Sequence, residues 1–207
     1  AVTYSLTSAA SSQKFALKAE ETTKLLMPMS EERSTLRQSL IPHLVEATAY
    51  NVARQMDSVA LYEIGSVFLG QTAEQLPFEE EHLALVLTGK WTDNAWQGEK
   101  KNVDFFVAKG IIEALFAKLG LTERVSYVKA TIDGLHPGRT AHVLLDGEVV
   151  GLIGQLHPAE QKQAGVKETY VAELNLLAIL NAQVEELVYT VVPRFPSITR
   201  DIALELD

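Results

Sequence analysis

Residues 83–89, Leu-Ala-Leu-Val-Leu-Thr-Gly, are a nearly continuous apolar run that ends at a glycine. A strand with one face in water alternates apolar and polar side chains, whereas a strand covered on both faces has no polar side. We therefore expect residues 83–89 to form a central strand with other parts of the chain packed on both faces. An acidic loop, residues 74–81, is expected to lead into it.

Strand signals continue on both sides of this run. Residues 59–68 are rich in β-branched and aromatic side chains, and Gly65 within them indicates a bulge or a close approach of the backbone to a neighbour. Asp146-Gly147 is a favoured two-residue turn between the apolar segments 141–145 and 148–153, which predicts a hairpin. Other strands are predicted at residues 2–6, 125–129, 170–174 and 201–206.

Helical patterns occupy the segments between these strands. The strongest helix is predicted from Asp104 to Leu119, with one apolar stripe made of Phe106, Ile111, Leu115 and Leu119. A second helix is expected after Pro42, which suits a first helical turn, and it continues to about Gln55. Shorter helices are predicted within residues 11–24, 30–40, 158–164 and 175–180. The sum is an α+β domain with a mostly antiparallel sheet flanked by helices.

The composition is that of an ordinary globular domain with an acidic balance. The 207 residues carry a net charge of −9, and phosphate contacts need clustered Lys and Arg, so a dedicated nucleic-acid-binding domain is disfavoured. The absence of cysteine excludes disulfides and thiolate metal sites. No apolar run approaches the roughly 18 residues that would suggest a membrane span. We expect a cytosolic protein.

No catalytic constellation is visible in the sequence. The 5 histidines have no partner at i+3 or i+4, and no phosphate-binding or nucleophile-elbow glycine motif occurs, so no catalytic residue, cofactor site or metal site is predicted. In His136-Pro137-Gly138-Arg139, Pro-Gly predicts a tight turn, and the Arg139 guanidinium can donate to a carboxylate or a phosphate. The ordinary alternative is a turn in which Arg139 pairs with a nearby acid or carbonyl. His136 and Arg139 are therefore candidates for a structural turn or a polar site.

The first helices carry the features of a protein interface. Arg33, Arg37 and Arg54 lie around an apolar stripe, and an apolar centre with a polar rim is typical of subunit contacts. The ordinary alternative is that the stripe serves only the core of this domain. The candidate interface residues are Arg37, Leu40, Leu44, Val45, Thr48 and Val52.

Six segments, in the same order, resemble the β subunit of bacterial phenylalanyl-tRNA synthetase. They are PMSEERSTLRQSLIP at 28–42, LYEIGSVF at 61–68, VDFFVAKG at 103–110, HPGR at 136–139, GLIGQLHP at 151–158 and FPSITRD at 195–201. Each segment alone is a weak signal, but their shared order makes the resemblance specific, and they span essentially the whole chain.

The resemblance implies a class II aminoacyl-tRNA synthetase-like fold. Residues 1–190 are then a catalytically degenerate core domain, and residues 191–207 are a linker and the start of a ferredoxin-like anticodon-binding domain. Enzymes of this family are (αβ)₂ heterotetramers in which the α subunit carries the site for ATP, phenylalanine and the tRNA end. The implied cofactors, ATP and magnesium, are used by the whole enzyme and are not bound by this domain. The implied partners are this α subunit and, through the full complex, tRNA(Phe), without a membrane.

The resemblance also implies that this domain is a copy of the class II catalytic module that has lost catalytic activity. Class II active sites resemble a pattern in which a strand ending in Phe-Arg-x-Glu places an arginine on the ATP α-phosphate, where charge develops. Here Phe68 is followed by Leu69 and Gly70. We therefore expect a non-catalytic structural and interface domain that binds no ATP by itself. The alternatives are a stand-alone tRNA-binding module and an active adenylate-forming ligase domain.

Overall fold

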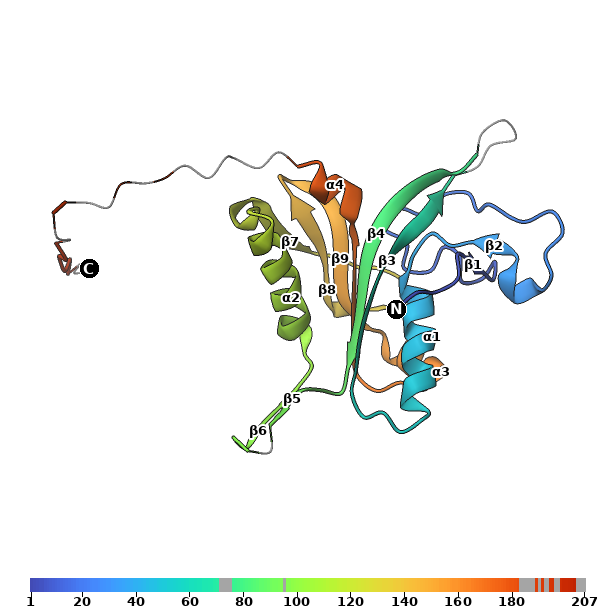
Figure 1. Ribbon diagram of the computed structural model, residues 1–207, viewed down its shortest axis with the longest axis horizontal. Coiled ribbons are helices and arrows are strands. Elements are labelled where there is room, and N and C mark those ends of the chain that lie inside the picture. The colour runs from blue at the N-terminus through green and yellow to red at the C-terminus, as the bar shows by residue number, and fades with distance from the viewer. Residues whose placement is uncertain are drawn as a thin grey trace, which may run out of the picture.

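The computed structural model describes residues 1–70, 76–94, 96–182, 189, 191, 194–195 and 198–203. Its centre is a six-stranded sheet in the order β3-β4-β10-β9-β8-β7, in which every neighbouring pair is antiparallel (Figure 1). The predicted α+β class with a mostly antiparallel sheet is confirmed.

The described residues contain ten strands, four α-helices and two 3₁₀ turns. The central sheet consists of β3 (Val59–Leu69), β4 (Phe78–Thr88), β7 (Val125–Lys129), β8 (Leu135–Leu145), β9 (Glu148–Leu156) and β10 (Thr169–Asn175). Two small pairs are β1 (Leu6–Thr7) with β2 (Thr35–Leu36), and β5 (Lys90–Asn94) with β6 (Glu99–Asn102). The helices are α1 (Ile41–Val52), α2 (Phe105–Lys118), α3 (Pro158–Ala164) and α4 (Leu176–Leu180), and the turns are η1 (Glu31–Arg33) and η2 (Thr122–Arg124).

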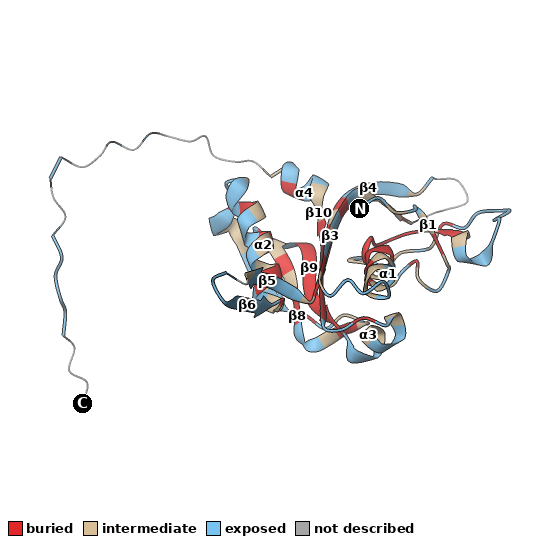
Figure 2. Cartoon of the chain, turned by 60° about the horizontal axis from the view of Figure 1, so that its bottom comes forward, coloured by how far each residue is buried: buried red, intermediate tan, exposed pale blue. Residues whose placement is uncertain are grey.

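Strand β4 is covered on both faces, as its apolar run predicts. Ala84 and Val86 belong to the core on the α1 side, while Leu85 and Leu87 belong to the core on the α2 side. Helices α1 and α3 lie over one face of the sheet, and α2 and α4 lie over the other (Figure 1). Buried residues follow the strands and the helix faces turned toward them (Figure 2). The sheet therefore separates two apolar cores.

Local chemistry fixes several element ends. Asp104 caps α2, because its carboxylate accepts the backbone N–H of Val107 at 2.7 Å. Asp146 and Gly147 adopt positive φ angles of 52° and 87°, which match the twist of a two-residue hairpin turn. The predicted hairpin of β8 and β9 is thereby confirmed.

The first forty residues depart most from the prediction. Only Leu6 of the segment 2–6 lies in a strand, and residues 11–24 contain turns and bends instead of a helix. The helix predicted over residues 30–40 shrinks to the turn η1. The cause is long-range pairing, since the Ser12 hydroxyl donates to the Leu36 carbonyl at 2.7 Å and the Gln38 N–H donates to the Ser12 carbonyl at 3.0 Å. These backbone groups are then not available to a helix.

Two further predictions are corrected. The acidic loop is shorter than expected, because Phe78 already begins β4, where Glu79 pairs with Phe68 of β3; residues 74 and 75 lie outside the described part. The buried face of α2 consists of Val107, Ala108, Ile112 and Phe116. The predicted stripe lies beside this face, and Phe106 is 74% exposed. The buried face is the one that packs on the sheet, and Ile111, Leu115 and Leu119 are only partly buried at its border.

The predicted division near residue 190 stays a prediction. A strand is expected at residues 201–206, but residues 201–203 are not in a strand, and residues 204–206 lie outside the described residues. Residues 196 and 197 of the segment 195–201 also lie outside the described residues.

Candidate functional site

The predicted interface stripe faces the interior of the domain. The side chains of Leu40, Leu44 and Thr48 have no exposed surface, and Arg37 is 4% exposed. Leu44 and Thr48 are covered because α1 packs on β3, β4 and β10, and Leu40 lies at the start of this helix. Within this domain the four side chains are thus covered by its own core, as the ordinary alternative has it, and their part in a subunit interface stays a prediction. The other two candidates, Val45 and Val52, are partly exposed.

The outer surface beside α1 still carries apolar groups. On the helix, Tyr50 is 58% exposed, with the Arg54 guanidinium 3.3 Å from its ring centroid. In the loop before η1, Leu26 and Met29 are fully exposed and Met27 is 91% exposed. The loop lies on the same side of the sheet as α1 (Figure 1). We call residues 25–29 the apolar loop. Contiguous exposed apolar side chains of this kind mark protein contact sites.

Arg37 forms a buried ion pair within the domain. Its Nη1 donates to Glu63 Oε1 at 2.9 Å and to the Thr3 hydroxyl at 2.8 Å, and its Nε donates to the Ser66 carbonyl at 3.0 Å. Glu63 is 2% exposed. A Cβ at Gly65 would lie 2.6 Å from Arg37 Nη2, so the predicted close approach at this glycine is confirmed, with a side chain as the neighbour. The pair fixes the segment before α1 to β3.

A second buried network fixes the start of α1. Glu173 on β10 has no exposed surface, and its Oε2 accepts the Ser39 hydroxyl at 2.6 Å and the Leu40 N–H at 3.1 Å. The Ser39 hydroxyl in turn accepts the Ile41 N–H at 3.1 Å. Leu40, at the N-cap, provides no side-chain cap of its own. At the start of α1, the Leu40 N–H is therefore satisfied by a carboxylate from the middle of the sheet, and the Ile41 N–H by the Ser39 hydroxyl that this carboxylate holds.

His82 on β4 supplies the counter-charge for this carboxylate. Its Nδ1 lies 2.7 Å from Glu173 Oε1, and its Nε2 lies 3.2 Å from Glu80 Oε2, which also accepts from Asn175. Both ring nitrogens thus face carboxylate oxygens, an arrangement that suits an imidazolium, in which both nitrogens donate. Burial alone lowers the pKa of His82, but the hydrogen bonds and charges of Glu173 and Glu80 outweigh it, so its pKa lies above the usual 6.5.

This raised pKa predicts a pH dependence of stability. A raised pKa in the folded state means that the stabilisation by His82 is complete below about pH 6.5 and is lost as the pH rises through the folded-state pKa. We expect the free energy of unfolding to fall over this range, with a slope of at most about 1.4 kcal/mol per pH unit from this one proton. His82→Gln should remove that slope, as measured by urea unfolding between pH 6 and pH 9. Parallel curves for the two proteins would contradict the assignment.

Sequence reasoning missed these networks, although one signal was present. Glu63 lies within the apolar strand 59–69, and Glu173 lies between Ala172 and Leu174 in β10. A carboxylate that is buried among apolar strand residues must be paired. The partners Arg37 and His82, however, lie 26 and 91 residues away, and no local pattern indicates them.

The segment 136–139 is not a tight turn. It lies inside β8, where the pairing with β9 shifts between Leu135 and Thr140. Arg139 donates to Gln155 at 2.7 Å and to Glu168 at 2.9 Å. Glu168 also accepts the phenol of Tyr170 at 2.6 Å, and burial together with this bond raises the pKa of Tyr170 to about 12. Arg139 therefore pairs with a nearby acid, as the ordinary alternative has it, while a wider role for His136 and Arg139 stays a prediction.

The position of the missing class II arginine is filled by a buried side chain. Leu69 at the end of β3 is 9% exposed. By the two-residue period of a strand, it lies on the same face as Val67, which belongs to the α1-side core. Arg37 and Arg33 on this side are already engaged, Arg37 with Glu63 and Arg33 with the Leu6 carbonyl at 2.8 Å. The guanidinium N–H groups of both arginines thus donate to groups within the domain.

The opposite face carries an apolar cleft of about 340 Å³ between β3, β4 and α2. Its lining is almost entirely hydrocarbon and includes Leu83, Leu85, Trp91, Ile111 and Leu115. Binding sites for nucleotides need several convergent polar groups, which this cleft does not provide. Among the described residues, no cluster of His, Asp or Glu could hold a metal ion, and no helix is long and apolar enough to cross a membrane.

Comparison with known proteins places this architecture in context. The profile of the family described as phenylalanyl tRNA synthetase beta chain CLM domain matches residues 1–176. The chain is 57% identical over 207 residues to the phenylalanine–tRNA ligase β subunit of Geobacillus kaustophilus, and 52% identical over 207 residues to that of Bacillus subtilis. Each alignment covers 100% of this chain and 26% of the relative, so the chain spans about a quarter of their length.

Among solved structures, a pyrrolysyl-tRNA synthetase of Desulfitobacterium hafniense has a similar fold. Its TM-score is 0.61 at 15% sequence identity, covering 87% of this chain and 60% of that one. At this identity the likeness concerns the fold alone, and it agrees with the expected class II synthetase architecture.

Proposed function

The chain belongs to the phenylalanyl-tRNA synthetase β-chain family, and we propose that it is a non-catalytic structural domain through which the β subunit contacts the α subunit of the ligase. In this proposal, ATP, magnesium and phenylalanine are bound outside this domain, tRNA(Phe) is engaged by the full complex, and the complex works in the cytoplasm.

The observation that carries the non-catalytic role is the filled α1 side of the sheet. Leu69 is buried where a class II active site needs a cation, and the neighbouring Arg37 is engaged by Glu63. Adenylyl transfer needs preorganised positive charge on the α-phosphate. A hydrocarbon side chain cannot supply it, and Arg37 could supply it only by leaving Glu63 buried and unpaired.

The interface role rests on the surface beside α1. The apolar loop and Tyr50 expose large apolar groups, which a partner surface would remove from water. Val45 and Val52, the partly exposed members of the predicted stripe, lie on the same helix. We therefore move the proposed centre of the interface from the inner face of α1 to the apolar loop and Tyr50.

Copurification tests this proposal directly. The full β subunit containing this chain is coexpressed with a tagged α subunit, and Leu26→Asp/Met29→Asp is compared with the unchanged protein. We expect recovery of β with α to fall by about tenfold or more, because the carboxylates would be desolvated in an apolar contact. Both side chains are fully exposed in the domain, so its unfolding temperature should stay unchanged.

Val149→Asp, at a half-exposed position beside the β8–β9 turn, is the matched control and should copurify normally. Normal recovery of the Leu26→Asp/Met29→Asp protein would remove the apolar loop from the interface. Failure of the unchanged subunit to bind α would overturn the interface role itself.

A further inference from the structure

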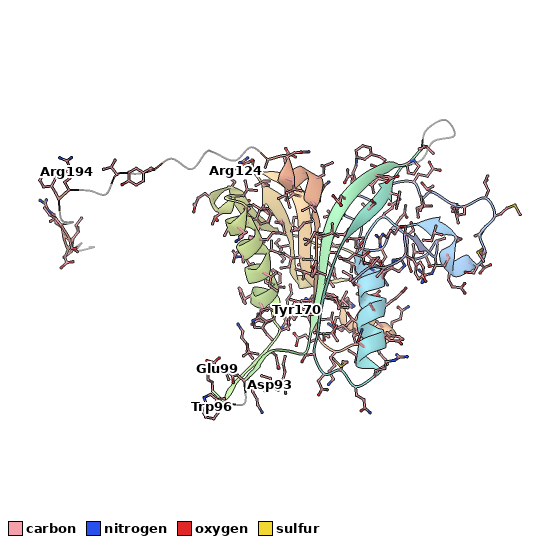
Figure 3. All side chains as sticks on the ribbon, viewed as in Figure 1. Asp93, Trp96, Glu99, Arg124, Tyr170 and Arg194 are labelled. Carbon is pink, nitrogen blue, oxygen red and sulfur yellow. The ribbon has the colours of Figure 1, made fainter. Side chains whose placement is uncertain are left out.

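The β5–β6 hairpin stands apart from the rest of the domain. Its two strands form a separate sheet that projects from one end of the molecule (Figures 1 and 3). Every residue of β6 is exposed, and the Trp96 side chain between the strands is 95% exposed. Figure 3 shows Trp96 at the far end of the hairpin, with Asp93 and Glu99 nearby. No sequence pattern singled out this element.

The base of the hairpin is firmly attached. The Val103 N–H donates to the Gly89 carbonyl at 2.9 Å, and the Lys90 N–H donates to the Ser58 hydroxyl at 2.9 Å. Val103 is 7% exposed, and Trp91 lines the apolar cleft. The two tryptophans therefore have different positions: Trp91 lies against the domain, whereas Trp96 extends into solvent.

A local turn holds Trp96 in this exposed position. The side-chain oxygen of Asn94 accepts the N–H of Trp96 at 3.2 Å and the N–H of Gln97 at 3.4 Å. An Asn in this arrangement stabilises a turn through its own side chain. A tryptophan has one of the largest apolar surfaces of any side chain, and full exposure leaves that surface in water. The turn thus presents an indole that has no packing role in the described part of the domain.

The charges of the hairpin favour an anionic partner. Lys90 pairs with Asp93 at 2.6 Å, whereas Lys100 and Lys101 are exposed and form no ion pair with any described residue. Glu99 is exposed as well, so the hairpin carries three lysines against two acids, a small positive excess. These lysines belong to a chain whose net charge is −9, so they form a local exception to its acidic balance. Lysines are depleted from protein–protein interfaces, whereas lysines beside an exposed aromatic ring are typical of sites for single-stranded nucleic acid.

We propose that the β5–β6 hairpin is a contact site for single-stranded RNA, in which Trp96 stacks on a base while Lys100 and Lys101 contact phosphates. The proposal rests on the proposed function, because it takes an unpaired stretch of the ligase's tRNA as the ligand. Stacking on an aromatic ring tolerates any base, and the two ammonium groups add a salt-dependent attraction that is independent of sequence.

The test uses the assembled ligase, with β carrying Trp96→Ala or Lys100→Ala/Lys101→Ala. Binding of labelled tRNA(Phe) is measured at several salt concentrations. We expect Trp96→Ala to weaken binding about tenfold, as for loss of one stacked base. The lysine variant should lower the dependence of log K on log salt by about 1.4, since each single-strand phosphate contact contributes about 0.7. Trp96→Phe should restore most of the affinity.

Matched controls test whether the loss of RNA binding is specific to the hairpin or follows from the loss of any exposed aromatic ring or lysine. Phe78→Ala removes another exposed aromatic ring, at the start of β4, and Lys118→Ala/Lys162→Ala removes two exposed lysines elsewhere; neither should change binding. Heparin, a polyanion without bases, should respond to the lysine variant and not to Trp96→Ala.

The outcomes distinguish this proposal from the function on which it rests. Assembly with the α subunit is measured first in the same preparations. If the assembled variants bind tRNA with unchanged affinity and salt dependence, the hairpin proposal fails and the interface role stands. If the variants lose the α subunit but not RNA, the hairpin is a protein contact and the RNA proposal is overturned.

Discussion

Replacing Glu63 with alanine is expected to lower the free energy of unfolding by about 3–5 kcal/mol, the usual cost of removing one partner from a buried ion pair. The reason is that Arg37 remains, 4% exposed, without the carboxylate that lies 2.9 Å from its Nη1. Arginine cannot lose its proton within a protein, so the cation cannot escape its burial by titrating. Urea unfolding of this chain at neutral pH measures the loss.

Two further variants separate the effect of the Glu63 charge on stability from the effect of its side-chain volume. Glu63→Gln keeps the shape of the side chain but not its charge, and it should be strongly destabilising as well. Arg37→Met/Glu63→Leu removes both charges, and it should recover much of the lost stability, because an apolar pair of similar volume avoids the desolvation of two ions. A double variant no more stable than Glu63→Ala would show that the further hydrogen bonds of Arg37, to Thr3 and Ser66, are what matter.

Replacing Glu173 with alanine should have the next largest effect, about 3 kcal/mol at pH 6. The change leaves the His82 imidazolium with only Glu80 and removes the acceptor of the Ser39 hydroxyl and the Leu40 N–H. The loss should be smaller at pH 8, because His82, unlike Arg37, can release its proton. This contrast in pH dependence between the Glu63 and Glu173 variants is the strongest check on both networks.

Hydrogen exchange locates the second effect. In Glu173→Ala, the amides of Leu40 and Ile41 should exchange faster, since the first turn of α1 loses its support. Glu173→Gln keeps an oxygen acceptor at this place and should protect these two amides, although it still removes the negative charge beside His82. Equal exchange in the two variants would argue that the helix start does not depend on this side chain.

The strand, turn and helix with strong local patterns could be predicted from the sequence. The apolar run at 83–89, the Asp146-Gly147 turn and the capped helix beginning at Asp104 each contain the chemistry that determines them within a few residues. The class II fold was expected from the order of six short segments, which composition and periodicity could not have provided.

The surroundings of α1 could not be predicted in the same way. Leu40 and Leu44 form a stripe that suits either a subunit contact or a core, and only the position of β4 and β10 decides between them. The segment before α1 owes its shape to Ser12, which lies 24 residues from its partner Leu36. Local propensity has no means of indicating such a contact, and here the contact replaces a helix.

The Glu173 carboxylate that supports the start of α1 also predicts an order of folding for the domain. Glu173 lies 133 residues beyond Leu40, in the last described strand of the central sheet, and contacts between residues so far apart are expected to close late because a long loop must be ordered first. A nascent or misfolded chain in which β10 has not paired with β4 therefore lacks a supported first turn of α1. If the surface beside α1 is the docking site, its folded conformation is available to the partner subunit only after the sheet is complete. Assembly would then select for β chains that have folded.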